Sequence, residues 1–223
     1  MTLYRTDLAK GTKTALNASQ SEALPQRIEF VNSVALAIND IIEMGPLLED
    51  HVIVDLILDS DDLDTNGAPA ITLSVGILNA AKTDLDTVAS GGALWIVAST
   101  VAQAGGAVRP TTLHAFRLQA MSALRRLIGI KVVAAAATTV AALTNLNVNR
   151  GLWMPNTAYT ANDFFTLPNG VRQKCTTTGV SGAVKPQFNA AYNNTTADGT
   201  AVWTTADPVI GLTVVTRSAN FGS

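Results

Sequence analysis

The sequence predicts an all-β protein, with a β-sandwich or jelly-roll-like domain that includes a short helix, followed by a smaller C-terminal β domain. Three observations predict this class. Apolar and polar residues alternate along a series of short runs, which is the period of a β-strand. Turns rich in glycine, asparagine and aspartate separate the runs at intervals of about 8–15 residues, a spacing typical of sandwiches and jelly rolls. Aromatic residues gather in the last third of the chain.

The chain carries few charges. Charged residues form 14% of its 223 residues, whereas ordinary soluble domains contain about 25%. Because a soluble monomer normally exposes more charge, this composition indicates a protein that packs against copies of itself or against partners. A compositional habit of the source organism is the alternative. The net charge of −2 provides no basic surface, so no nucleic-acid partner is expected.

Nothing in the sequence suggests export, a membrane or disulfide bonds. The N-terminus is polar and lacks the apolar segment of a signal peptide. The most apolar window, Val132 to Leu143, is too short to span a bilayer, so no membrane partner is expected. Cys175 is the single cysteine, which excludes an internal disulfide and is typical of a small buried residue.

Residues 1–24 are expected to form an N-terminal arm, because polar residues dominate and only isolated leucines could anchor it. Such arms become ordered on a neighbour, although a strand or short helix docked on the arm's own domain fits equally well. The main β-sandwich is expected to span residues 25–150. It opens with a predicted strand from Pro25 to Leu36 and a second short strand from Ile41 to Gly45.

The stretch from Val52 to Asn79 is expected to organise this domain as a central β-hairpin. Two runs with a period of two flank an acidic turn that contains glycine, and this pattern favours two strands joined by a turn. The expected faces carry Val52, Val54, Leu56 and Leu58 in the first run, and Ile71, Leu73, Val75 and Ile77 in the second.

The acidic turn contains part of a calcium-loop pattern. Asp62, Asp64, Asn66 and Gly67 stand at positions 1, 3, 5 and 6 of an EF-hand loop. Leu73 stands where the loop needs a bidentate glutamate, and the flanking sequences are strand-like. We therefore expect a structural turn, in which Asp and Asn make local hydrogen bonds. A weak cation site at Asp62, Asp64 and Asn66 is the alternative, and no other metal or cofactor is expected.

The rest of this domain is expected to contain further strands around one helical segment. Strands are predicted at Leu94 to Thr100, at Ile128 to Val132 and at Leu143 to Val148. The stretch from Ala80 to Val88 fits a short helix or a loop. The stretch from Leu113 to Arg126 fits a helix or a transition from loop to strand.

Residues 151–223 are expected to form a separate small β module that projects from the sandwich. Asn169-Gly170 and Asp198-Gly199 are typical hairpin turns. A further strand is predicted from Ile210 to Thr216. The aromatic residues of this region are Trp153, Tyr159, Phe164, Phe165, Phe188, Tyr192 and Trp203.

The sequence shows no catalytic pattern, and an enzyme is not expected. The histidines, His51 and His114, lie far apart and have no metal-ligand or triad partners at suitable spacing. Phosphate-binding loops and nucleophile motifs are absent. A hydrolase with paired carboxylates is the remaining enzyme class, although Asp163 and Asp198 stand at predicted turns.

Residues 25–150 contain three motifs, VDLILDSDDLD, TLSVGILN and RLIGIKV. These motifs resemble structural proteins of tailed bacteriophages and, more narrowly, their head decoration (cement) proteins. The resemblance implies a structural virion protein, made in the host cytoplasm, that decorates and stabilises the outer surface of a capsid by protein–protein contacts. It implies two partners, the major capsid protein and further copies of the chain in a homotrimer.

The motifs WMPNTAYTANDFF, NGVRQKCTTTGVSGAVKPQF and DGTAVW lie between Trp153 and Trp203. They resemble a small β module of phage head and tail proteins and also chitin-binding-like carbohydrate modules. The second resemblance implies that Trp153, Tyr159 and Trp203 stack on sugar rings. The alternative function is therefore a tail-fibre or baseplate-associated adhesion protein that binds host or environmental carbohydrate, with surface glycans as partners.

The sequence departs from the carbohydrate-module pattern at one place. An aromatic residue normally follows the glycine, but Val171, Arg172 and Gln173 stand there. This departure weakens the expectation of glycan binding while leaving the expected β fold intact. The aromatic residues then serve the core of the module instead.

Overall fold

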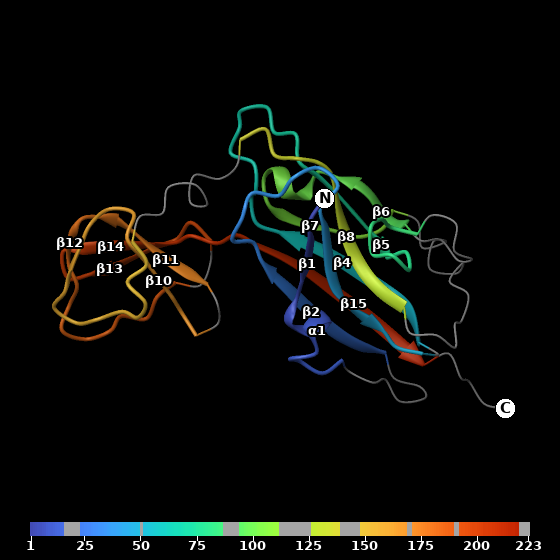
Figure 1. The fold of residues 1–223 in the computed structure, drawn as a ribbon, viewed down its shortest axis with the longest axis horizontal. Helices are drawn as coiled ribbons and strands as arrows, with labels where there is room; N and C mark the ends of the chain where they lie inside the picture. Colours follow the sequence, from blue (N-terminus) through green and yellow to red (C-terminus); the bar gives the residue numbers. More distant parts are fainter. Residues whose placement is uncertain are drawn as a thin grey trace. The chain divides into compact units, whose positions relative to one another are not determined.

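The computed structural model describes residues 1–15, 23–49, 51–86, 94–111, 126–138, 148–168, 171–189 and 192–218. The predicted all-β class is confirmed, because strands dominate and the α-helix α1 (Asp7–Lys10) has only 4 residues. None of the described helices is long and apolar enough to cross a membrane. The chain divides into two compact units (Figure 1). The first comprises Met1–Phe30, Leu36–Thr138 and Ile210–Ser223, and the second comprises Val31–Ala35 and Thr139–Val209.

The first unit contains two sheets. The strand orders are β1-β3-β8-β5-β6 and β2-β15-β4-β7. The strands of the first sheet are β1 (Leu3–Arg5), β3 (Ile41–Leu47), β8 (Arg126–Ala134), β5 (Thr72–Ile77) and β6 (Leu94–Ser99). Those of the second are β2 (Leu24–Val31), β15 (Val209–Ser218), β4 (His51–Ser60) and β7 (Gly106–Val108), and a short 3-10 helix, η1 (Val101–Gln103), precedes β7.

One apolar core lies between these two sheets, as the predicted sandwich requires. Both sheets contribute fully buried side chains to a single cluster. Alternate residues of each strand point into it, because successive side chains of a strand face opposite sides of a sheet. The core includes Ile42, Met44, Leu73, Val75, Ile128 and Ile130 from one sheet, and Leu56, Leu58, Ile210, Leu212 and Val214 from the other.

The predicted central hairpin is wrong in its pairing. Strands form in both halves of Val52 to Asn79, but β4 pairs with β15 and β7, whereas β5 pairs with β6 and β8. The two strands lie in different sheets and contribute to the same core. Alternation shows which face of a strand is buried but does not specify its neighbour. The acidic segment between them is therefore a connection between sheets.

The prediction of which side chains of β4 are buried is also wrong for the first half of the strand. The second run is confirmed, because Leu73 and Val75 are fully buried. In β4, however, the buried side chain is Ile53 rather than Val52 or Val54. A register shift causes this change: β15 passes from opposite Asp55 directly to opposite Ile53, so Val54 is an extra residue. Such a β-bulge reverses the alternation of faces.

The outer face of the first sheet is covered as well. Ile41, Leu78 and Leu85 form a second small apolar cluster there, so β5 is buried on both faces. The described part of the predicted Ala80–Val88 helix or loop, up to residue 86, forms turns. The predicted helix at Leu113 to Arg126 lies outside the described residues except for Arg126, and so do most of the predicted strand from Leu143 to Val148 and the Asn169-Gly170 turn.

The first half of the predicted arm docks on its own unit. β1 pairs in parallel with β3, and α1 follows at once. Thr6 caps this helix with its side chain, and Gly11 ends it with φ of 80°, a conformation that favours glycine. Residues 16–22 of the predicted arm lie outside the described residues.

The second unit contains two small sheets. Their strand orders are β10-β11-β14-β13 and β12-β9. Asp198-Gly199 forms the predicted hairpin turn between β13 and β14, where Gly199 has φ of 64°. The strands are β9 (Ala158–Tyr159), β10 (Phe164–Thr166), β11 (Arg172–Thr177), β12 (Gly179–Val180), β13 (Thr195–Asp198) and β14 (Ala201–Thr205).

The division of the chain differs from the predicted domains 1–24, 25–150 and 151–223. The predicted tail strand forms as β15, but it pairs with β4 in the first unit and not with the small module. Its residues Ile210, Leu212 and Val214 supply buried side chains to the first core. The chain thus leaves the first unit, builds the second and returns.

Candidate functional site

The predicted sugar-stacking residues form the core of the second unit. The Tyr159 and Trp203 rings meet edge to face, with centroids 4.7 Å apart, and Phe165 packs on Trp203 at 4.8 Å. Trp203 is 0% exposed and Tyr159 1% exposed. Trp153 packs against the same cluster and is partly buried. Because sugar stacking requires an accessible ring face, Tyr159 and Trp203 serve as core residues in this structure instead.

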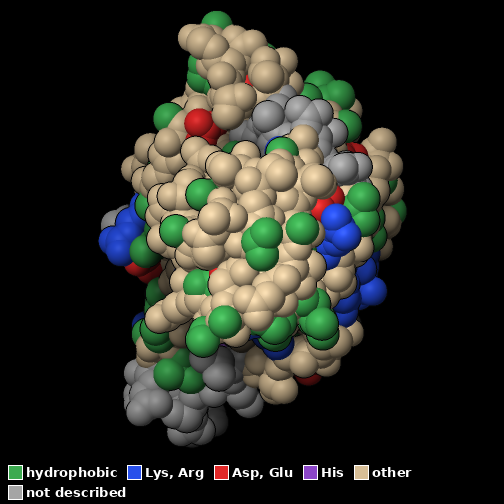
Figure 2. Space-filling view, turned by 90° about the vertical axis from the view of Figure 1, so that its left-hand side faces the viewer, with side chains coloured by type: hydrophobic (Ala, Val, Ile, Leu, Met, Phe, Trp, Pro, Cys, Tyr) green, Lys and Arg blue, Asp and Glu red, His purple; other side chains and the backbone are tan. Residues whose placement is uncertain are grey.

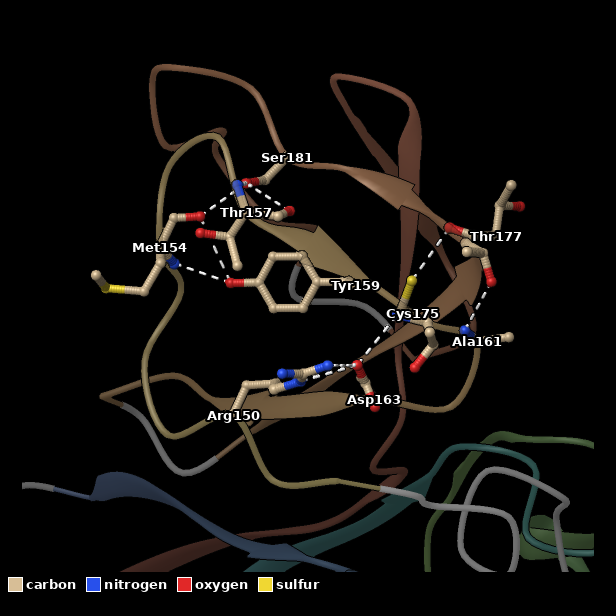
Figure 3. Close-up of polar contacts among 11 residues, drawn as sticks. Arg150, Met154, Thr157, Tyr159, Ala161, Asp163, Cys175, Thr177 and Ser181 are labelled. Atoms are coloured by element: carbon tan, nitrogen blue, oxygen red, sulfur yellow. Dashed lines mark hydrogen bonds and ion pairs between the residues drawn. The ribbon is translucent and has the colours of Figure 1, made fainter.

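Hydrogen bonds fix the position of the Tyr159 ring (Figure 3). Its hydroxyl oxygen accepts a bond of 2.9 Å from the Met154 backbone N–H. The Ser181 hydroxyl donates to the Met154 carbonyl oxygen at 2.7 Å, and the Thr157 N–H donates to the Ser181 hydroxyl oxygen at 3.0 Å. These contacts join the loop around residues 151–157 to the segment that follows β12.

Asp198 binds two of the three predicted sugar-stacking residues, Trp153 and Trp203. Its Oδ2 accepts hydrogen bonds from Trp153 Nε1 at 2.7 Å and from Trp203 Nε1 at 3.0 Å. Its Oδ1 accepts a bond of 2.8 Å from the Gly182 N–H. Asp198 is only 3% exposed, so its carboxylate satisfies donors that would otherwise be buried without a partner.

Asp163 is a second buried carboxylate with a specific partner (Figure 3). Its Oδ2 accepts two bonds from the Arg150 guanidinium, at 2.8 Å and 2.7 Å, and one of 3.0 Å from the Thr160 N–H. Burial alone would raise the pKa of Asp163. The bonds from Thr160 and Arg150 outweigh burial and hold the pKa below its ordinary value.

Asp207 is the third buried carboxylate of the second unit. It accepts hydrogen bonds from the Arg172 backbone N–H at 2.9 Å and from Arg172 Nε at 2.8 Å. Asp163, Asp198 and Asp207 are the aspartates of this unit, which contains no glutamate. All three are 3% exposed or less. The second unit therefore uses its carboxylates as internal braces and exposes none of them.

Exposed apolar side chains accompany this absence of exposed carboxylates. Figure 2 looks onto the second unit and shows scattered hydrophobic side chains among uncharged polar groups, with charged side chains mainly near the margins. Two segments of this unit are joined by hydrogen bonds between Asn156 and Gly182 and between Met154 and Ser181. They carry four of its exposed large apolar residues. We call these four residues the uncharged surface: Leu152 (71% exposed), Met154 (56%), Val180 (46%) and Val184 (80%).

Sequence reasoning missed the uncharged surface. The signal available was the absence of charge from Gly151 to Asn162 and from Thr176 to Val184. Apolar residues in such loops look like core residues when read without a structure.

The predicted cation turn is braced by its own backbone. Asp64 is 1% exposed, and its Oδ2 accepts bonds from the N–H groups of Ala70, Ile71 and Ala137. Burial alone would raise the pKa of Asp64, but these bonds and one from the Thr138 N–H lower it to about 2. Asp64 thus ties the connection between β4 and β5 to the end of β8.

Asp62 and Asn66 make local hydrogen bonds in the same segment. Asp62 Oδ1 accepts from the Asp64 N–H at 2.9 Å, and Asn66 Oδ1 accepts from the Ala68 N–H at 2.8 Å. These are the Asx hydrogen bonds expected of a structural turn. Among the described residues, no group of three His, Cys, Asp or Glu side chains could hold a metal ion.

The sequence predicts no catalytic residues, and the aspartates and histidine considered for that role make separate contacts in the described chain. Asp163 and Asp198 are each bound to separate partners, as described above. His51 is 6% exposed, and its Nδ1 lies 2.7 Å from the Glu49 carbonyl oxygen. His114 lies outside the described residues.

Cys175 provides a probe of the second unit. The side chain is 0% exposed, and burial, together with the negative charge of Asp163, raises the pKa of its thiol. We expect a thiol reagent to label Cys175 at neutral pH at least about a hundredfold more slowly in the folded protein than in denaturant, because labelling requires opening of the unit. Equal rates in the two conditions, measured by mass spectrometry, would contradict the burial of this side chain.

Comparison with known proteins identifies a relative. No protein-family model and no curated protein matches the chain. A chain from the capsid of Ralstonia phage GP4 matches with a TM-score of 0.57 and 26% sequence identity, over 96% of this chain and 97% of that one. The chain is similar in sequence and structure to a phage capsid protein. A chain of the cyanophage Pam1 capsid asymmetric unit also matches, with a TM-score of 0.44 and 17% identity over 91% of this chain and 92% of that one.

Proposed function

We propose that the protein is a structural virion protein that decorates the outer surface of a bacteriophage capsid and stabilises it. The observation that carries this proposal is the match to the capsid chain of Ralstonia phage GP4, which extends over 96% of this chain. The match therefore includes both β units and is not confined to one common sheet. The partners in this proposal are the major capsid protein and other copies of this chain in a homotrimer.

The surface chemistry supports attachment to protein. A decoration protein stabilises a shell because it binds the assembled state and not the separate subunits, so binding shifts the equilibrium toward assembly. The uncharged surface and the buried carboxylates of the second unit are compatible with a protein that is assembled with other proteins.

Within this proposal the first unit contacts the shell and the second projects from it. We propose no enzymatic activity, since the described carboxylates and His51 serve as structural groups. The adhesion alternative loses its chemical basis in the burial of Tyr159 and Trp203, which would have to expose their ring faces.

The proposal is tested by the mass of the protein in solution and its binding to shells. We expect light scattering after size-exclusion chromatography to give a trimer. We expect this trimer to co-sediment with purified shells and to raise their melting temperature.

A matched variant locates the contact. Leu152→Ser with Val184→Ser changes the uncharged surface without touching a buried residue. If the first unit contacts the shell, this variant should bind shells within about twofold of the wild type. A large loss would assign the contact to the second unit, whereas failure of the wild-type protein to sediment with shells would overturn the proposed function.

A further inference from the structure

The pair Asn66-Gly67 stands in the connection between β4 and β5, and the proposed function makes no use of its chemistry. The residues from Thr65 to Ala68 are all exposed. The pair lies beside the end of β8 (Figure 1), because Asn66 Nδ2 donates to Thr138 Oγ1 at 2.8 Å. This turn is therefore open to water, while its asparagine side chain is held in place.

A hydrogen bond polarises the carbonyl group of the Asn66 side chain. Its Oδ1 accepts from the Ala68 N–H at 2.8 Å, which makes an Asx turn. If a nucleophile attacks Cγ, negative charge develops on Oδ1, and a backbone N–H aimed at that oxygen stabilises the charge. Cγ and the Gly67 nitrogen both belong to the ring that this hydrogen bond closes. The bond therefore limits their separation and polarises the carbonyl group at the same time.

The nitrogen of Gly67 is available for such an attack. Among the described residues, none forms a hydrogen bond with the Gly67 N–H. A Cβ atom at this position would meet nothing within 4 Å, and glycine itself has no side chain to crowd the nitrogen. Since an amide nitrogen must lose its proton before it attacks a carbonyl carbon, an exposed N–H without a partner favours the reaction.

Other described asparagines differ from Asn66 on both counts. The N–H group that follows each of Asn39, Asn156 and Asn162 donates a hydrogen bond of 3.0–3.1 Å to another residue. The residue after each of them also carries a side chain. We call these three the comparison asparagines. The other Asn-Gly pair of the sequence, Asn169-Gly170, lies outside the described residues.

We propose that Asn66 is a site of spontaneous covalent modification, at which the folded chain loses ammonia and the asparagine becomes aspartate or isoaspartate. The Gly67 nitrogen gives up its proton and forms a bond to Asn66 Cγ, while the bond from Cγ to Nδ2 breaks and ammonia leaves with that proton. Water then adds to either carbonyl carbon of the cyclic imide and breaks its bond to the Gly67 nitrogen. No oxidant or reductant takes part.

The product changes the contact between this turn and β8. The Nδ2 donor to Thr138 is lost, and a carboxylate takes its place in a segment that already contains Asp62 and Asp64. Isoaspartate also adds a carbon atom to the backbone that connects the two sheets. The modified chain carries one more negative charge, so anion-exchange chromatography should separate it from the original protein.

Incubation of the full-length protein at neutral pH, followed by digestion under mildly acidic conditions and mass spectrometry, tests the proposal. We expect the peptide with Asn66 to show the mass change from amide to acid at least about tenfold faster than the peptides of the comparison asparagines. An isoaspartate methyltransferase should label the same peptide. If Asn66 stays intact in the folded protein while the denatured chain is converted, the proposal is wrong.

Gly67→Ala is the matched variant. Gly67 is not one of the described glycines with a positive φ, and the added Cβ meets nothing within 4 Å. The fold should therefore be unchanged, as circular dichroism and thermal unfolding would check. The new methyl group crowds the attacking nitrogen, so we expect conversion of Asn66 to slow by at least about tenfold. Equal rates in the two proteins would exclude the Gly67 nitrogen as the nucleophile and overturn the proposal.

Discussion

Replacing Asp64 with asparagine is expected to lower the free energy of unfolding of the first unit by about 4 kcal/mol, because several buried backbone N–H groups lose their charged acceptor. The Asp64 carboxylate accepts bonds of 2.7 Å from Ala70, 2.8 Å from Ala137 and 2.9 Å from Thr138. An asparagine amide nitrogen cannot accept such bonds. Urea unfolding followed by circular dichroism measures the loss, and Cys175 labelling reports the second unit separately.

The lowered pKa of the Asp64 carboxyl predicts that acid destabilises the folded protein. The pKa of Asp64 is about 2 in the folded protein and about 3.9 in an unfolded chain. Since the folded value is the lower one, the stabilisation is complete above pH 4 and is lost as the pH falls through 2. This group should contribute about 2–3 kcal/mol of pH-dependent stability. The contribution should disappear in Asp64→Asn.

Asp62→Asn is the matched control for this position. Among the described residues, Asp62 Oδ1 accepts from the Asp64 N–H, and Asp62 is partly exposed, so its loss should cost less than about 1 kcal/mol. Equal costs for the two variants would refute the bracing role of Asp64. A rise in the melting temperature of the wild type on addition of millimolar Ca²⁺ would instead favour the cation site.

Replacing Asp198 with asparagine is expected to destabilise the second unit by about 3 kcal/mol. One carboxylate oxygen accepts from both indole N–H groups, of Trp153 and Trp203, and the other accepts from the Gly182 N–H. An asparagine has one acceptor oxygen, so it can accept in place of only one carboxylate oxygen. Its amide N–H₂ then faces the N–H donors that the other oxygen had bound. The labelling rate of Cys175 in the folded protein should rise by about a hundredfold.

Trp153→Phe separates the contribution of the indole hydrogen bond from that of ring packing. It keeps an aromatic ring against the core and removes only one indole N–H, so we expect a loss of about 1 kcal/mol. If Asp198→Asn proves no more costly than Trp153→Phe, the carboxylate does not organise the aromatic core.

Periodicity predicted where strands form but not how they pair. The alternation of Ile71 to Ile77 identified the face of β5 that contributes to the first core, since side-chain period is a local property of a strand. Pairing is a long-range property, so the placement of β4 and β5 in separate sheets had no local signal. The bulge at Val54 depends on the partner strand β15, more than 150 residues later in the sequence.

The candidate site shows the same limit. Asp64 and Asp198 both stand in stretches with ordinary turn composition, and each could be read correctly as a turn residue. Their main bonds reach residues distant in sequence: Asp64 bonds to Thr138, and Asp198 to Trp153. The aromatic spacing from Trp153 to Trp203 is compatible with a core or with a sugar platform. Only the burial of the rings distinguishes the two.

The return of the chain through β15 has a consequence for how the protein is made. β15 lies between β2 and β4, inside its sheet, and it contributes Leu212 and Val214 to the first core. It also follows the whole of the second unit in the sequence. The first unit therefore cannot complete its sheet during synthesis until the whole second unit has emerged, and a chain ending at residue 150 would leave β2 and β4 unjoined.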